Sequence, residues 1–274
     1  MPLVAHIMDV GCGNMALIVL GDGSVCCYDC NITAEGEESV LSYLDAVIGE
    51  GTAIDVFINS HRDADHMRGI KSLHSSHPIA EIWETGVPGT TTDSPEYEGY
   101  MDLRRNVATS VIDARKYWNR GGAKLRCMNS HWDDYAESND QSIVMKIEFK
   151  GASLMLAGDT SYRPWKEKIL TCYEDADLQS SILLASHHGS ITFFDDPSDT
   201  QNYYTAHIKK IKPAMTLVSV GPNVHDLPDE KALKLYDTYS TGSDKGNKVF
   251  TTEEKGTMKL TLHDNGGWNL LVNQ

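Results

Sequence analysis

The chain has 274 residues, of which 41% are hydrophobic and 23% are charged, so it can bury a sizeable core without disulfide bonds. Its 24 lysines and arginines against 39 aspartates and glutamates give a net charge of −15, which argues against a protein that coats nucleic acid. The first residues do not show the basic and then apolar pattern expected of a signal peptide, and no apolar run approaches the ~18 residues of a membrane span. We therefore expect a cytoplasmic protein that does not enter a membrane.

Hydrophobic periodicity and turn residues predict mixed elements in the first half of the chain. A β-meander is expected first, then a helix and a buried strand, over residues 3–10, 15–20, 25–30, 35–48 and 54–58. A helix over 67–74, a strand over 79–83, a loop over 84–98 and a helix over 100–120 follow.

The second half continues to mix strands with helices. Strands are expected over 124–127, 142–149, 153–157, 182–185 and 215–220, with three short ones ending at Val272. Helices are expected over 163–172, 201–211 and 229–239. No repeat or linker divides the sequence, so residues 1–274 are predicted to form a single α/β domain.

Four of the predicted strands are followed at once by polar or metal-binding side chains. These polar segments are residues 60–66, 158–160, 186–190 and 223–225. Ligands of α/β proteins bind outside the carboxyl ends of strands, where such segments converge. We therefore expect the four segments to form one shared site.

Residues 61–66, with the sequence His-Arg-Asp-Ala-Asp-His, are the densest of these segments. Two neighbouring carboxylates both stay ionised only beside a cation, and imidazole together with carboxylate suits zinc, manganese or iron. The alternative is a solvated loop in which Asp65 caps a helix, but that leaves both histidines without a role. Metal ligands are therefore predicted at His61, Asp63, Asp65 and His66.

Four further residues complete the predicted site. Asp159 follows a strand, which favours a ligand over a simple Asx turn. His187 and His188 are adjacent, so one can bind a metal while the other faces substrate, and either can instead be a packed structural histidine. His225 is either a site residue or a surface residue beside a helix.

Together these motifs resemble those of the metallo-β-lactamase-fold hydrolases, whose signature loop is HxHxDH. Here Asp63 replaces the second histidine, a variant similar to the ComEC-like metallo-β-lactamase domains. Further matches lie at residues 8–15, 28–30, 139–144, 157–159, 187–190 and 219–225.

The resemblance implies an αββα sandwich with two divalent metal ions, zinc or manganese, at its edge. His61 and Asp63 would hold one ion and Asp65 and His66 the other, with Asp159 bridging and His187 or His188 completing the set. The family's remaining histidine has no counterpart except Asn139 or Asp140, which favours manganese over zinc.

The predicted function is hydrolysis by a hydroxide held between the two metals. Asp65 would orient this hydroxide, and His188 or His225 would protonate the leaving oxygen. The expected substrate is a phosphodiester in a small nucleotide or single-stranded nucleic acid, because two divalent ions offset the acidic chain.

Two other functions are left open. One is a hydrolase of an acyl bond such as a lactone or thioester. The other is a non-catalytic metal-binding module that recognises a partner through residues 84–98, Tyr203 and Tyr204. A protein partner and a homo-oligomer are both compatible with the sequence.

Overall fold

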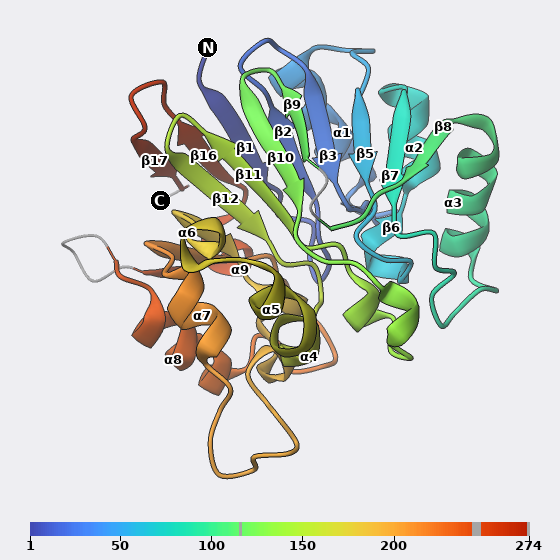
Figure 1. The fold of residues 1–274 in the computed structure, drawn as a ribbon. Helices are drawn as coiled ribbons and strands as arrows, with labels where there is room; N and C mark the ends of the chain where they lie inside the picture. Colours follow the sequence, from blue (N-terminus) through green and yellow to red (C-terminus); the bar gives the residue numbers. More distant parts are fainter. Residues whose placement is uncertain (115–116, 243–247, 273–274) are drawn as a thin grey trace.

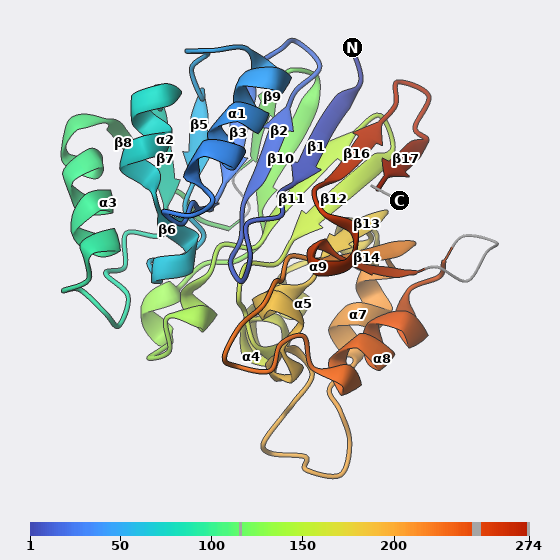
Figure 2. The ribbon, with the colours of Figure 1, turned by 180° about the vertical axis from the view of Figure 1, so that it is seen from behind.

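A computed structural model describes residues 1–114, 117–242 and 248–272, and two β-sheets lie face to face at its centre (Figures 1 and 2). Within these residues the first sheet has eight strands, in the spatial order β17 (Trp268–Leu271), β16 (Met258–Leu262), β1 (Leu3–Ile7), β2 (Ala16–Val19), β3 (Val25–Tyr28), β5 (Val56–Ile58), β7 (Glu81–Glu84) and β8 (Ala108–Val111). The second has seven described strands, in the order β15 (Val249–Thr251), β14 (Met215–Val218), β13 (Ile182–Leu184), β12 (Ala152–Leu156), β11 (Met145–Phe149), β10 (Ala123–Cys127) and β9 (Tyr117–Arg120). A short parallel ladder joins β4 (Cys30–Asn31) to β6 (Met67–Arg68).

Helices cover the outer face of each sheet. The first sheet is covered by α1 (Glu37–Ile48), α2 (Ile70–Ser76) and α3 (Pro95–Asn106). The second is covered by α4 (Tyr162–Pro164), α5 (Leu170–Cys172), α6 (Asp175–Leu178), α7 (Ala206–Ile211) and α8 (Glu230–Tyr239), while α9 (Thr252–Lys255) follows β15. The expected αββα sandwich is confirmed.

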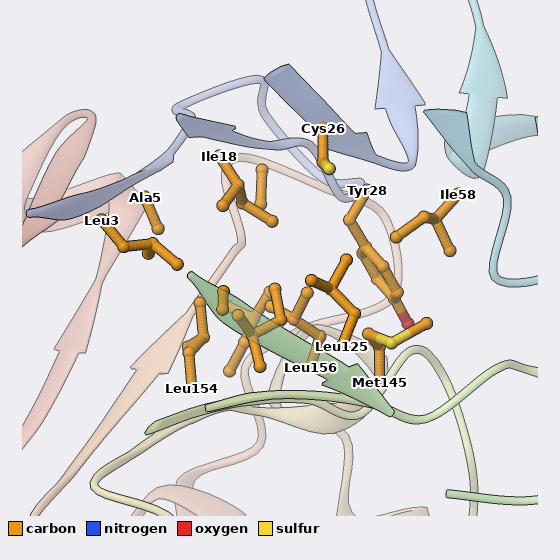
Figure 3. Close-up of a cluster of buried hydrophobic side chains, with 14 of the residues drawn as sticks. Leu3, Ala5, Ile18, Cys26, Tyr28, Ile58, Leu125, Met145, Leu154 and Leu156 are labelled. Carbon is orange, nitrogen blue, oxygen red and sulfur yellow. The ribbon is translucent and has the colours of Figure 1, made fainter. Parts of the chain in front are cut away.

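Both faces of each sheet are covered, and successive side chains along a strand pack on opposite faces. Cys26 and Tyr28 of β3 point into the core between the sheets, as do Leu154 and Leu156 of β12 (Figure 3). The intervening Met155 packs instead with the outer helices of the second sheet. Because successive side chains point to opposite faces, a strand covered on both sides needs an unbroken apolar run.

The predicted helix over 100–120 is wrong. Helix α3 begins at Pro95, because the Ser94 hydroxyl accepts a hydrogen bond from the Tyr97 N–H and proline suits the first helical position. The helix ends at Asn106, and the chain continues as β8 and β9, where β-branched residues such as Val111 favour a strand. Residues 115 and 116 of the predicted helix lie outside the described part of the chain.

Two predicted helices begin later than expected. The helix expected over 67–74 starts at Ile70, because Met67 and Arg68 pair with β4. The helix expected over 201–211 starts at Ala206. Within the described ranges, no helix is both long enough and apolar enough to cross a lipid bilayer.

His207 of α7 is a structural histidine, fully buried among aromatic side chains. Its ring stacks on Phe193 with a centroid separation of 4.0 Å, and Nε2 donates to the Phe193 carbonyl oxygen at 2.6 Å. Its Nδ1 accepts from the Ile208 N–H at 2.7 Å, so the ring is neutral. Burial lowers the pKa of His207 from 6.5 to about 3.

We expect His207 to make the fold sensitive to acid. Its depressed pKa means that the unfolded chain binds a proton that the folded chain does not, so stability falls as the pH drops from about 6.5 towards 3, by about 1.4 kcal/mol per pH unit. His207→Phe should remove this part of the slope, as measured by urea unfolding at several pH values. Equal slopes for wild type and variant would contradict the expectation.

Candidate metal centre

The polar segments after β5, β12 and β13 meet at one edge of the two sheets. Strands β12 and β13 run parallel, as do β3 and β5, so their carboxyl ends reach the same edge. One ligand atom from each of four residues lies within 4.8 Å of the others, and the four are Asp65, His66, Asp159 and His188.

His66 and His188 are each held through one ring nitrogen and present the other to carboxylates. Nδ1 of His66 donates to Asp29 Oδ2 at 2.8 Å, and Nδ1 of His188 donates to the Ser219 carbonyl oxygen at 3.0 Å. Nε2 of His66 and Nε2 of His188 lie 3.2 and 3.4 Å from Asp159 Oδ2. Such anchoring fixes the tautomer and orientation of a metal-ligating histidine.

His61 and Asp63 form a second group beside the first. Nδ1 of His61 lies 3.1 Å from the Ser142 hydroxyl, and its Nε2 lies 3.5 Å from Asp63 Oδ2. Asp63 accepts a hydrogen bond from the Ser138 hydroxyl at 2.7 Å. The rings of His61 and His66 are 4.1 Å apart between centroids, so the two groups adjoin.

The two adjacent histidines lie at different places relative to the cluster. His187 and His188 have φ angles of 49° and 52°, a left-handed conformation that costs a non-glycine residue on the order of 1 kcal/mol and clusters at functional sites. His188 joins the four-residue cluster. Nε2 of His187 lies 3.9 Å from Asp159 Oδ2 and 3.4 Å from the Asn139 side-chain nitrogen, at the edge of the cluster.

Gly158 lets the chain present Asp159 to the histidines. Its φ is +57°, and a Cβ there would lie 2.7 Å from the Ser142 Cβ, so a larger residue would clash. The Asp159 N–H donates to the Ser142 hydroxyl at 3.0 Å, which fixes the start of its side chain.

Three buried atoms of these two groups lack hydrogen-bond partners in the described structure. They are Nε2 of His61, Nε2 of His66 and Oδ1 of Asp159. A buried polar atom without a partner costs about 1–3 kcal/mol, so unpaired atoms at one place call for an explanation. Imidazole nitrogen and carboxylate oxygen are ligands of zinc and manganese, and these residues therefore fit a divalent metal centre.

Charges in the cluster shift each other's titration. Burial opposes the charged form of His66 and His188, but Asp159 and neighbouring carboxylates outweigh it, raising the pKa of His66 well above its usual value and that of His188 to about 10. Although burial acts to raise the pKa values of Asp65 and Asp159, the histidines hold both below their usual value. The metal-free protein therefore keeps protons on nitrogens that would bind a metal.

A cavity of about 340 Å³ opens onto this centre, and its lining includes Asp63, Asp65, Asp159, His187, His188 and His225. His61 and His66 are buried and do not line it. His225 is exposed, and its N–H donates to Asn223 Oδ1 at 2.9 Å. A larger cavity of about 710 Å³, bordered by Val111 and Trp132, contains none of the predicted site residues.

Asp29 is the main contributor that was not among the predicted site residues. Its buried carboxylate accepts hydrogen bonds from the Ser60 N–H at 2.7 Å and the Ser60 hydroxyl at 2.8 Å as well as from His66. The signal was available, because Asp29 directly follows β3 just as the predicted ligands follow their strands. Asp29 therefore positions Ser60, which directly precedes residues 61–66 (the ligand loop), and His66 within that loop.

We expect Asp29→Asn to weaken metal binding by about 10–100-fold. Asparagine tolerates the left-handed backbone of residue 29, where φ is 57°, and still accepts from the Ser60 N–H. Its NH₂ group would face Nδ1 of His66, which must then accept, so the ring proton moves to Nε2 and blocks the ligand position.

Zinc titration of metal-stripped protein in competition with a chelator measures this loss. Asp196→Asn is the control, because Asp196 is a buried aspartate that pairs with Lys166 at 2.6 Å outside the cluster. Wild-type affinity in Asp29→Asn would show that Asp29 does not orient His66.

The fold and the site define a class of proteins, αββα sandwiches that carry a histidine and aspartate metal centre at the strand ends. The metallo-β-lactamase superfamily model matches residues 9–194, and the chain belongs to this superfamily of metal-dependent hydrolases. The resemblance inferred from the motifs is confirmed at this level.

Individual relatives are distant. The chain is 21% identical over 236 residues to ComE operon protein 3 of Bacillus subtilis, covering 85% of this chain and 27% of that protein, so it spans about a quarter of this relative's length. The metallo-β-lactamase fold protein YhfI of Bacillus subtilis matches with a TM-score of 0.56 and 14% identity, over 94% of this chain and 100% of that one. A diphosphatase of the PhnP family matches with a TM-score of 0.51 and 14% identity, over 95% and 99%.

Proposed function

We propose that this protein is a phosphodiesterase that uses two divalent metal ions, zinc or manganese, to cleave small nucleotides or single-stranded nucleic acid. The observation that carries the proposal is the buried cluster of imidazoles and carboxylates, with unpartnered ligand atoms, beside a cavity of about 340 Å³. Pockets of about 300 Å³ and more hold small ligands.

The ligands divide into two sets. Asp65, His66 and His188 would hold one ion, and His61 and Asp63 the other. Asp159 would bridge the two, since Oδ2 faces the histidines and Oδ1 has no hydrogen-bond partner in the described structure. His187 lies beside the bridging carboxylate.

The cavity is negatively charged, so an anionic substrate would need bound cations in order to enter it. Three carboxylates line it, and its described lining includes neither lysine nor arginine. Bound divalent ions lower the pKa of a coordinated water towards ~7 and neutralise charge on a phosphoryl group. An anionic diester would therefore enter only the metal-loaded site, and its alkoxide leaving group would need a proton from the chain.

The residues at the cavity can take distinct roles. Asp65, with 31% of its side chain exposed, is placed to accept a hydrogen bond from the attacking water. Both nitrogens of His188 are engaged, one by the Ser219 carbonyl and one by Asp65 at 3.1 Å, which favours a ligand over a proton donor. His225 then remains as the donor to the leaving oxygen.

Hydrolysis assays on metal-stripped protein reloaded with manganese or zinc test this function. We expect turnover of bis-p-nitrophenyl phosphate and no turnover without metal. Activity confined to p-nitrophenyl acetate or a lactone would favour an acyl hydrolase. No activity on either class would favour a metal-binding module and overturn the proposal.

His225→Ala is expected to lower kcat by about 10²–10⁴-fold for a diester with an alkyl leaving group, because an alkoxide needs the proton. The loss should be much smaller for bis-p-nitrophenyl phosphate, whose leaving group needs no acid, and metal content should stay unchanged. Equal losses on both substrates would refute a proton-donor role.

A further inference from the structure

A buried charge network anchors Arg62, the residue between the predicted ligands His61 and Asp63. Nη2 of Arg62 donates to Oε2 of Glu84 at 2.8 Å, and the two side chains are only 4% and 1% exposed. Glu84 is the last residue of β7, the strand next to β5, and β5 is the strand that leads into Arg62. The ligand loop is thus fastened to the sheet by an ion pair outside the metal cluster.

Helix α3 completes the network on the same carboxylate. The Tyr100 hydroxyl donates to Oε2 of Glu84 at 2.6 Å, and Nε of Arg104 donates to Oε1 at 2.8 Å. Tyr100 and Arg104 are one helical turn apart, so α3 presents both to Glu84. Both oxygens of this buried carboxylate therefore accept hydrogen bonds, from Arg62 and from two residues of α3.

The ion pair between Arg62 and Glu84 is costly to break because both side chains are buried. Removing one partner of a buried ion pair leaves an uncompensated charge in the core, so Arg62 is strongly held at Glu84. Nε of Arg62 is itself buried and unpartnered among the described residues, which leaves Glu84 as its compensating charge. Fixing Arg62 fixes the backbone on both sides of it, and with it the two flanking ligands.

The other half of the centre has anchors of its own. His66 is held by Asp29, and His188 by the Ser219 carbonyl oxygen. Neither anchor is part of the Glu84 network. Asp29 contacts His66 directly and reaches His61 only through the Ser60 hydroxyl, whereas the Glu84 network holds the residue between His61 and Asp63.

We infer that Glu84 and Arg62 are positioning residues for the His61 and Asp63 half of the metal centre and leave the other half unaffected. The inference rests on the proposed function, because it presupposes two ions. It makes binding of one ion depend on an ion pair that contacts neither ion nor substrate.

Cobalt reloading of the metal-stripped full chain tests the inference, with ion counts from elemental analysis and visible absorption of each bound ion. Wild type is expected to bind two ions. Glu84→Gln and Arg62→Gln should keep one tight ion and weaken the other by about 10–100-fold. Arg62→Lys, which keeps the charge but loses the planar fork, should show a smaller loss.

Two variants serve as controls. Arg104→Met removes another Glu84 partner without touching the ligand loop, and it should keep both ions. Asp29→Asn should weaken the ion at His66, with an absorption change different from that of Glu84→Gln and Arg62→Gln.

If Glu84→Gln and Arg62→Gln each bind both ions with wild-type affinity, the inference is overturned, even where thermal stability is reduced. The proposed function would then still stand. Equal weakening of both ions in these variants would also overturn it. A wild type that binds no ion would overturn both.

Discussion

Asp159→Asn is expected to abolish hydrolysis and to reduce metal binding more than any other single substitution at the site. Asp159 Oδ2 lies 3.2 Å from Nε2 of His66 and 3.4 Å from Nε2 of His188, and Asp159 also carries an unpartnered oxygen, Oδ1. Loss of an outer partner costs about 10–100-fold in metal affinity, so loss of a shared ligand should cost more than about 100-fold.

The fold should survive this change, because the hydrogen bond from the residue 159 N–H to the Ser142 hydroxyl belongs to the backbone. Metal content, bis-p-nitrophenyl phosphate turnover and circular dichroism measure the three effects separately. Asp196→Asn again controls for the loss of a buried carboxylate. Turnover at the wild-type rate in Asp159→Asn would exclude Asp159 as a bridging ligand.

Metal binding at about pH 7 is expected to release about two protons per chain. In the metal-free protein the surrounding carboxylates raise the pKa of His188 to about 10 and that of His66 well above its usual value, so both are protonated at pH 7. A metal ion binds only the neutral imidazole, and each Nε2 must therefore lose its proton.

The sign of the pH dependence follows from this competition. Raising the pH removes the competing protons, so apparent metal affinity should rise by up to about 100-fold per pH unit between pH 6 and the pKa values of the two histidines. Calorimetric titration with zinc in buffers of different ionisation enthalpy counts the protons directly. Binding without proton release would show that His66 and His188 are neutral in the metal-free protein.

The gathering of these side chains at one edge was predictable because the signals for it are local in the sequence. Asp63, Asp65 and His66 lie within one short segment. Asp159 comes one glycine after an apolar run that is typical of a strand covered on both faces. Strand ends in an α/β sandwich meet at one edge, so their convergence followed from the class of fold.

Features that depend on tertiary contacts were not predictable in this way. The choice between His187 and His188 depends on a left-handed backbone at both positions, which no residue type there demands. The contacts of Asp29 with His66 and of Arg62 with Glu84 join residues far apart in the chain.

Helix α3 was misplaced for a local reason, because Ser94 and Pro95 mark its start more strongly than apolar periodicity does.

Several expectations stay predictions. The sequence suggests one domain over 1–274, a cytoplasmic location and a role for a protein partner or a second copy of the chain. The identity of the metal and of the substrate rests on the proposals above.

Anomalous diffraction from crystals grown with manganese or zinc tests the central claim most directly. We expect two peaks per chain, one on either side of the Asp159 carboxylate, with His66 and His188 at one and His61 and Asp63 at the other. Peaks confined to surface carboxylates, or no peak among these side chains, would contradict a two-ion centre.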